Sequence, residues 1–521
     1  MIRNGIKSTA AYKSAIWHLK RGNLYTKVIA IFLGPILFFQ KSKLFSKLPI
    51  INTLVTLCQK LIVTHKSAWK FEKNHLTKAI QDTISQNKVV NPPPRFSKVV
   101  IIGSGPGAVC AARHIAADDY IVLESGNSTS GSYGSHNLSQ VVMDFQRAGQ
   151  EVVISKPLIQ FGQGKTLGGG SEVNSGLYHQ TPTEIAKEWR LTIGATEDEW
   201  LTSQAEMESF LNINHDIPGS PSDSMIARSA LELGYEYLKV PRWRKYEGDY
   251  LTIHYGMREL FWHANPRNIY CGVEVTKIKT NHKNLEVISR DSTGKKYRIH
   301  CEKVVLCAGT VSTPLILARS RLIKLRNAEF NLHVMLRSLV KVPKSDLGAH
   351  DIDPFQSWSK DHTLKYGSAV SSPSLLSPTI GREIEEEESK GLRAFYVSFA
   401  PKGKGGFIPL IRLPYFKFNE SDRKVIAHAA AELCRTIDSD PMSSRVTTEK
   451  LIAENASTVH IFGSLPIGGR IVNEYGELIS DKRVIISDGS LLPTAPLVNP
   501  QGPIMTLCNL LAKRRNDNDQ G

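Results

Sequence analysis

The spacing of apolar and polar positions predicts a protein with both helices and strands. Residues 99–102 form a continuous apolar run, as in a strand buried on both faces, and "YIVLE" at 120–124 forms another. Residues 106–117, which lie between these runs, are expected to form a helix. The three segments together predict a β-α-β unit that begins about a hundred residues into the chain.

Later segments repeat both kinds of pattern. Residues 269–309 alternate apolar and polar positions with turn signals between the runs, which predicts a small meander ending in a buried strand at 304–307. At 419–437 a plausible capping residue is followed by apolar residues at helical spacing, which predicts a helix. A final helix with a basic end is expected at 503–515. Residues 483–493 are expected to be a strand that enters a turn.

The first part of the chain has a different pattern. Apolar runs occupy residues 28–39 and 48–63, and a proline-rich break at 91–98 ends this arm. The first run holds 12 residues and is interrupted by glycine and proline, whereas a spanning helix needs about 20 apolar residues. No small-residue cleavage site follows it, so it does not resemble a secretory signal.

Charge is concentrated in the same arm. Residues 1–98 hold 17 Lys and Arg against 2 acidic residues, so they account for +15 of the net charge of +16. Basic residues beside short apolar runs favour a monotopic or peripheral anchor on an anionic membrane surface. A helical layer packed on the protein's own body and a true membrane span are the alternatives. So much aliphatic surface argues against a nucleic-acid partner.

The seven cysteines contain no C-x-x-C pair, and most of them lie in apolar runs. Buried, reduced thiols are the simplest interpretation, and they indicate an intracellular compartment.

The turn after the first buried strand predicts a dinucleotide site. Gly103 permits a sharp turn, Gly105 lets a pyrophosphate approach the backbone, and Ala108, after Gly107, is small enough for helix and strand to pack closely. Glu124 ends the next strand, where a carboxylate can accept hydrogen bonds from a ribose diol and would repel a 2′-phosphate. FAD or NAD therefore fits this turn, and NADP does not.

Three further segments are rich in small residues. "GKTLGGGSEVNSGLYHQTP" (164–182) is suited to lie against a flat ligand with its backbone groups presented. "CAGTVSTPLILARS" (307–320) again allows close approach to a ligand. The third segment, "STVHIFGSLPIGG" (457–469) followed by "VIISDGSLLPTAPLVNPQGP" (484–503), places His460 and Asn499 in turns framed by glycine and proline.

In this order, the four motifs resemble those of the glucose-methanol-choline (GMC) family of flavin oxidoreductases over roughly residues 97–515. "SDGSLLPTAPLVNP" is similar to the sterol-oxidase branch, while "GGGSEVNSGLYHQTP" and "YFKFNESDRK" are closer to the long-chain alcohol oxidase branch. The motifs do not decide between the two branches. Proline occupies position 503, where the family often has threonine, and proline is acceptable in the first turn of a helix.

The resemblance implies an α/β (α+β overall) fold, with a Rossmann-like FAD-binding domain, an inserted antiparallel-sheet substrate domain and, outside the family core, the N-terminal helical arm. The implied FAD-binding segments are 97–190, 251–325 and 456–515; the cap and substrate-binding segments are 191–250 and 326–455; the arm is 1–96.

The resemblance also implies functional residues. Those expected to hold FAD are Gly103, Gly105, Gly107, Ala108, Glu124, Gly169, Gly170, Ser171, Asn174, Val275, Asp488 and Gly489. His460 and Asn499 match the family's catalytic pair facing the isoalloxazine, with His179 and His254 as weaker candidates. No metal is expected.

The implied reaction is oxidation of a CH–OH group by hydride transfer to flavin N5, with His460 taking or positioning the hydroxyl proton. The arm favours a lipophilic, long-chain or sterol-like alcohol, delivered from the membrane surface to which residues 1–96 attach. A membrane-bound sugar or polyol dehydrogenase and a flavin-binding assembly subunit without catalysis are the alternatives. The electron acceptor, oxygen or a quinone, stays open.

Overall fold

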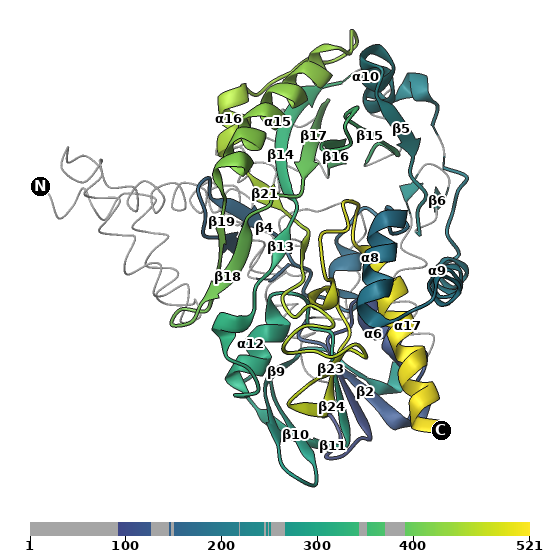
Figure 1. Cartoon of the computed structure of the whole chain (residues 1–521), viewed down its shortest axis with the longest axis vertical. Helices are drawn as coiled ribbons and strands as arrows, with labels where there is room; N and C mark the ends of the chain where they lie inside the picture. The colour runs from purple at the N-terminus through teal and green to yellow at the C-terminus, as the bar shows by residue number, and fades with distance from the viewer. Residues whose placement is uncertain are drawn as a thin grey trace, which may run out of the picture.

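A computed structural model describes residues 92–126, 145–146, 151–217, 219–243, 246–247, 250–251, 266–342, 352–369 and 391–520. The predicted anchor at 1–96 therefore lies almost wholly outside the described residues, as does His254. Among the helices in the described part of the chain, none is both long and apolar enough to cross a bilayer. The expected mixture of helices and sheets is confirmed, and two main sheets organise it (Figure 1).

The smaller main sheet contains the predicted β-α-β unit. Its strands, in spatial order, are β23 (Glu477–Leu478), β24 (Asp481–Ile486), β12 (Lys303–Leu306), β1 (Val99–Ile102), β2 (Tyr120–Leu123) and β8 (Ile269–Tyr270). Strand β1 pairs in parallel with both β2 and β12. Its apolar run is almost completely buried, because helices and neighbouring segments cover the sheet. The predicted meander is also confirmed: β9 (Val273–Thr280), β10 (Leu285–Asp291) and β11 (Lys296–Cys301) form a three-stranded sheet that leads into β12.

The three expected helices are present and differ from the expectation mainly at their ends, and the described residues form further helices that the patterns did not predict. Together they are α6 (Pro106–Ala112), α8 (Thr183–Ile193), α9 (Glu197–Leu211), α10 (Met225–Leu233), α12 (Ser312–Arg319), α15 (Glu420–Asp438), α16 (Glu449–Glu454) and α17 (Gln501–Gln520). Helix α6 ends at Ala112 rather than at 117, and the His114 imidazole just beyond it lies 2.8 Å from Asn509 of α17. Helix α17 runs along the smaller main sheet to the C-terminus (Figure 1) and is longer than predicted.

The larger sheet has nine strands and is mostly antiparallel. Its order is β3 (Glu151–Val153), β4 (Ile159–Phe161), β21 (Ser457–Thr458), β14 (Val334–Lys341), β17 (Leu392–Phe399), β16 (Lys365–Ala369), β15 (Phe355–Trp358) and β5 (Glu236–Lys239), with β20 (Ser444–Arg445) beside β14. Short pairs complete the described strands: β6 (Tyr246–Glu247) with β7 (Tyr250–Leu251), β13 (Asn331–Leu332) with β22 (Ile461–Phe462), and β18 (Lys404–Ile408) with β19 (Leu413–Lys417).

The two faces of this sheet differ in chemistry because successive side chains point to opposite sides. Leu336, Phe395 and Val397 belong to an apolar core that includes residues of α10 and α15, and these helices lie over that face (Figure 1). The opposite face carries Arg337, Lys365 and other polar side chains. A face of this kind needs either water or a ligand against it.

Some strands and helices pack on the other side of the molecule from the domain to which their segment was assigned by sequence. Strands β3, β4 and β21 fall in segments expected to bind FAD, yet they pair into the larger sheet. Helix α9, expected in the cap, packs on α17: the Ser203 hydroxyl donates to the Thr506 carbonyl at 2.8 Å. The chain passes from β21 of the larger sheet to β23 and β24 of the smaller one, so its C-terminal part contributes to both sheets.

Candidate active site

One cavity of about 680 Å³ lies between the two sheets. Its wall contains the glycine turn after β1, the "GGGSEVN" segment, the "AGT" segment before α12, both C-terminal turns and part of the larger sheet. All the small-residue motifs of the sequence therefore meet at a single place. Its volume lies within the range of about 300–1,000 Å³ that is usual for small-molecule sites.

In the turn after β1, two of the three glycines have no room for a side chain. Gly103 adopts φ +94°, and a Cβ built there would lie 2.3 Å from the Cys307 carbonyl oxygen. A Cβ on Gly107 would lie 1.9 Å from the Ser487 carbonyl oxygen, because α6 is pressed against the end of β24. Ala108 is fully buried. Gly105 is different, since nothing lies within 4 Å of a Cβ built there, and it lines the cavity. The space in front of Gly105 suits the close approach of a pyrophosphate.

This contrast gives a matched pair of variants. We expect Gly107→Ala to lower the free energy of unfolding of the apoprotein by about 1–3 kcal/mol, since the added methyl overlaps backbone. Gly105→Ala should leave apoprotein stability nearly unchanged but weaken FAD binding, because its methyl enters space that the cofactor needs. Urea unfolding of the apoproteins and flavin titration would check both expectations. Equal apoprotein stability of the two variants would contradict the steric assignment.

Glu124 lies beyond the end of β2 and lines the cavity. Its carboxylate accepts hydrogen bonds from the Ser104 hydroxyl at 2.6 Å and the Gly126 amide at 2.6 Å. Burial raises the pKa of Glu124, and these donors oppose that shift. The 3.2 Å contact from Ser125 is the longest that its oxygens make, so a ribose hydroxyl could take that place. Val275 of β9 also lines the cavity, and its side chain is buried.

The "GGGSEVN" segment folds against the glycine turn. Residues Gly169–Glu172 form a single 3₁₀ turn, and a Cβ on Gly169 would lie 3.1 Å from the Gly105 Cα. Gly170 faces open space in the cavity wall. Ser171 closes the turn by donating to the Gly168 carbonyl at 2.7 Å. The Asn174 amide donates to Gln501 Oε1 at 2.7 Å, which links this segment to the start of α17.

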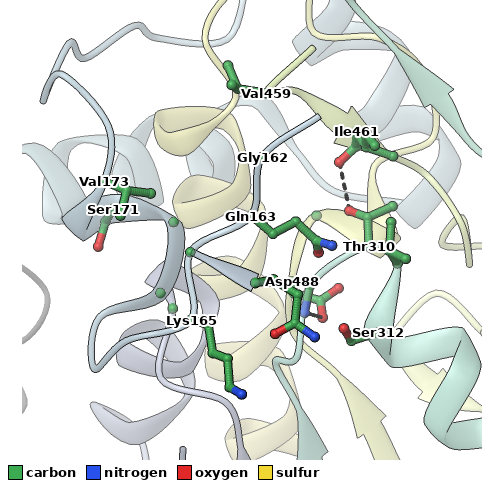
Figure 2. A pocket seen from close by; sticks show the side chains of 18 of the residues that line it. Gly162, Gln163, Lys165, Ser171, Val173, Thr310, Ser312, Val459, Ile461 and Asp488 are labelled. Atoms are coloured by element: carbon green, nitrogen blue, oxygen red, sulfur yellow. Dashed lines mark hydrogen bonds between the residues drawn. The ribbon is translucent and has the colours of Figure 1, made fainter. Parts of the chain in front are cut away.

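Asp488 links its own C-terminal turn to the 307–320 segment at the cavity wall (Figure 2). Its carboxylate accepts from the Gly309 amide at 2.9 Å and from the Thr313 hydroxyl at 2.6 Å. Burial raises its pKa, and these donors oppose that shift. The neighbouring Gly489 is buried, and a Cβ there would lie 3.0 Å from the Thr310 hydroxyl, which itself donates to the Ile461 carbonyl. Asp488 is therefore well placed to fix the backbone around a cofactor.

His460 follows β21 and lines the cavity from the side of the larger sheet. Its Nδ1 lies 3.3 Å from Nδ1 of His333, and the His333 amide donates to the His460 carbonyl at 3.0 Å. The Nε2 atom has no hydrogen-bond partner among the described residues. His333 is buried, and burial together with the charges of His460 and Lys365 lowers its pKa well below the usual value. Each neutral ring carries one proton, so one of the two Nδ1 atoms donates to the other across this contact.

Asn499 lies at the other side of the same cavity, just before α17. Its Oδ1 accepts a hydrogen bond of 2.6 Å from the ammonium of Lys365, a residue of β16. Lys365 is 4% exposed, and burial lowers its pKa to about 7. Burial and the charges of Lys365 and Arg337 lower the pKa of His460 to about 3. Lys365 thus contacts one member of the predicted catalytic pair and acts electrostatically on the other.

Two sequence profiles, both described as GMC oxidoreductase, match residues 101–259 and residues 408–508. An uncharacterized GMC-type oxidoreductase of Sinorhizobium fredii is 24% identical over 479 residues, which cover 80% of this chain and 93% of that protein. The chain belongs to the GMC oxidoreductase family. A long-chain-alcohol oxidase of Arabidopsis thaliana is 22% identical to this GMC oxidoreductase over 511 residues, 78% of this chain and 67% of that protein.

Solved structures share the fold at low sequence identity. Pyridoxine 4-oxidase from Mesorbium loti superposes with a TM-score of 0.60 at 14% identity, covering 80% of this chain and 99% of that one. A variant of formate oxidase from Aspergillus oryzae gives a TM-score of 0.66 at 11% identity, covering 82% and 100%.

As a GMC oxidoreductase, the protein is an FAD-dependent enzyme that acts on CH–OH donors. The predicted family, cofactor and enzyme class are thereby confirmed. The cavity fits this cofactor, because open backbone at Gly105 and Gly170 faces it and the Glu124 carboxylate, a group that can accept from a ribose, lines it. The assignment of individual residues to FAD stays a prediction, but the structure brings all the predicted residues except Ala108 to the cavity wall.

The sequence motifs of this GMC oxidoreductase did not reveal His333, Lys365 or Arg337. These residues lie in strands β14 and β16 or just before β14, outside every recognised motif. The sequence signal for Lys365 and Arg337 is a charged residue in the middle of an otherwise apolar strand, since charged side chains are seldom buried without a partner. His179, one of the weaker candidates, is buried, and burial lowers its pKa to about 3; it does not line the cavity.

Proposed function

We propose that this oxidoreductase oxidises the CH–OH group of a lipophilic alcohol, with His460 and Asn499 holding the hydroxyl. The observation that supports this most is that His460 and Asn499 meet at the wall of the cavity that fits FAD, with Asn499 held by the buried Lys365. FAD, when bound, supplies a hydride acceptor. The protein must then supply a base for the hydroxyl proton and donors that orient the oxygen.

His460 can serve as the base only in one tautomer. Its Nδ1 faces His333, so Nε2 is the nitrogen left for the substrate. For Nε2 to hold a lone pair, Nδ1 must carry the proton and donate it to Nδ1 of His333. His333 would then fix the tautomer of the base as a positioning residue.

Lys365 would position the second member of the pair. Its hydrogen bond to Asn499 Oδ1 turns the amide so that Nδ2, the donor, is free for the alcohol oxygen. An amine donates this bond whether it is neutral or charged, so the orientation persists on both sides of its pKa. The charge has a separate effect, since a cation near His460 opposes protonation of the imidazole.

A lipophilic substrate is supported by apolar side chains on the cavity side of the larger sheet. Met335, Leu339 and Tyr396 belong to an apolar cluster of the larger sheet, and Met335 and Tyr396 line the cavity. The basic, aliphatic arm at 1–96 adds an argument from sequence, because an enzyme held at a membrane can take a poorly soluble alcohol directly. Sterols and long-chain alcohols both satisfy these conditions.

His333→Leu tests the tautomer. We expect flavin reduction by substrate to slow about 10–100-fold, because His460 loses its acceptor and can turn a protonated nitrogen to the cavity. Nitrogen-15 NMR of the imidazoles should show an unprotonated Nε2 on His460 in the parent enzyme and a mixture in the variant. His333→Gln, which keeps an acceptor, should lose less activity. An Nε2-protonated His460 in the parent enzyme would exclude its role as base.

The proposed function is tested with the purified holoenzyme under anaerobic conditions. Fatty alcohols, sterols and sugars are mixed with it in turn, and bleaching of the flavin absorbance is recorded. Bleaching by lipophilic alcohols supports the proposal, whereas bleaching by sugars alone favours the polyol dehydrogenase.

The membrane part of the proposal needs a separate experiment. A chain lacking residues 1–90 and the full chain are sedimented with anionic vesicles. Equal binding of the two would refute the anchor.

A further inference from the structure

Three successive rows of side chains lie on the cavity side of the larger sheet, and four of their members line the cavity: Met335, Arg337, Tyr396 and Ala369. Strand pairing sets the first row as Met335, Ser398, Lys365 and Trp358, and the second as Arg337, Tyr396, Gly367 and Gln356. The third row holds Leu339, Ala394 and Ala369. The first row lies beside the catalytic pair, because Lys365 contacts Asn499 and Met335 pairs with Ser457 of β21.

The second row is polar and well ordered. The Gln356 amide donates to the Tyr396 hydroxyl at 3.0 Å. Gly367 makes room for this contact, since a Cβ there would lie 2.7 Å from the Tyr396 hydroxyl. Arg337 completes the row and lines the cavity.

Arg337 is half-buried at the cavity wall, and its guanidinium has no anionic partner among the described residues. Its Nε is buried and has no hydrogen-bond partner. Burial lowers its pKa to about 10, which leaves it charged at neutral pH. The carboxylates that line the cavity are engaged elsewhere: Glu124 with Ser104 and Gly126, Glu151 with Gln163, Glu274 with Arg290, and Asp488 with Gly309 and Thr313. A buried, unpaired cation is costly unless a ligand neutralises it.

We propose that Arg337 binds a carboxylate of the substrate, so that the enzyme oxidises a hydroxy acid. This inference rests on the proposed oxidation at His460 and Asn499 and names the substrate class more closely. A guanidinium matches a carboxylate with two parallel hydrogen bonds, which a neutral alcohol cannot offer.

The rows also set the position of this carboxylate. Residues two apart on a strand are about 7 Å apart, so Arg337 stands one row from Met335 and the catalytic pair. The third row beyond it is apolar. The substrate thus carries a carboxylate several bonds from the carbinol carbon, and an apolar part can lie over Ala369 of the third row. Such an amphiphile is compatible with a lipophilic chain.

The test compares acids with their neutral counterparts. The holoenzyme is reduced anaerobically by ω-hydroxy acids of increasing chain length and by the methyl esters of the same acids. At the best length, the acid should reduce the flavin with an apparent second-order rate constant at least about 10-fold above that of the ester. Equal rate constants for acid and ester at every length would overturn the inference while leaving the proposed alcohol oxidation intact. Absence of bleaching by any alcohol would instead overturn the proposed function.

Variants of Arg337 show whether this residue causes the preference for the acid over the ester. Arg337→Gln should bring the acid-to-ester ratio close to one, and Arg337→Lys should keep part of it. Arg298→Gln, on the exposed face of β11, is the matched control and should keep the parent ratio. Binding of unreactive hexanoate, followed by perturbation of the flavin spectrum, gives a readout that does not need turnover: the dissociation constant should rise about 10-fold or more in Arg337→Gln. A ratio or hexanoate affinity unchanged in Arg337→Gln would overturn the assignment to this residue.

Discussion

Replacing His460 by glutamine is expected to slow anaerobic flavin reduction about 10²–10⁴-fold, the usual contribution of a general base. Glutamine fills a similar space and can contact His333, but it cannot accept the hydroxyl proton at neutral pH. Bound flavin should be retained, because none of the residues predicted to hold FAD lies in the turn at 457–469 that carries His460. Stopped-flow absorbance with a substrate alcohol gives the rate directly.

The matched control for this variant is His282→Gln, an exposed residue between β9 and β10. It should leave the rate unchanged. If His460→Gln binds flavin and is reduced at the parent rate, another group takes the proton and His460 only lines the cavity.

Lys365→Met is expected to make the protein more stable and the enzyme slower. Burial lowers the pKa of this lysine to about 7, whereas the same group in the unfolded chain titrates near 10.5. The folded state therefore suffers from the charge below pH 7, and methionine should raise the free energy of unfolding there by about 2 kcal/mol after loss of the Asn499 hydrogen bond. Flavin reduction should slow about 10-fold, because Asn499 is no longer oriented.

The sign of the pH dependence follows from the same pKa. Between about pH 7 and 10.5 the unfolded chain binds the proton and the folded protein does not, so this group makes stability rise with pH in that window. The rate of flavin reduction should also rise through pH 7, since loss of the Lys365 charge makes His460 a better proton acceptor. Both pH effects should vanish in Lys365→Met. The control variant Lys303→Met, in β12 of the smaller main sheet, should retain both pH effects. An unchanged pH profile in Lys365→Met would show that Lys365 does not titrate in this range.

The part of the fold that the sequence predicts best is encoded locally. The strand–turn–helix after residue 98 follows from an apolar run and three glycines, and the structure shows why two of them cannot carry a side chain. Helix α15 likewise begins at the expected cap, Asn419, whose side chain accepts from the Asp422 amide. The residues that form each of these signals lie close together along the chain, so they can be recognised without knowledge of the fold.

The rest of the site depends on pairing between distant strands. Lys365 meets Asn499 across 134 positions of sequence, and Arg337 faces the cavity only because β14 pairs with β17 in one register. A shift by one residue would turn both strands' polar side chains to the opposite face. The alternation of apolar and polar residues along each strand does not determine which residue of β14 pairs with which residue of β17. For the same reason, strands β3, β4 and β21 could not be assigned to the larger sheet from sequence.

The most direct test of alcohol oxidation at this site is anaerobic mixing of the holoenzyme with a substrate alcohol, protiated or deuterated at the carbinol carbon. We predict that the flavin bleaches, that the aldehyde or ketone is formed in equal amount, and that deuterium slows the bleaching several-fold. An enzyme whose flavin stays oxidised with every alcohol tested, or one that bleaches without forming a carbonyl product, would contradict the assignment of His460 and Asn499 to this reaction.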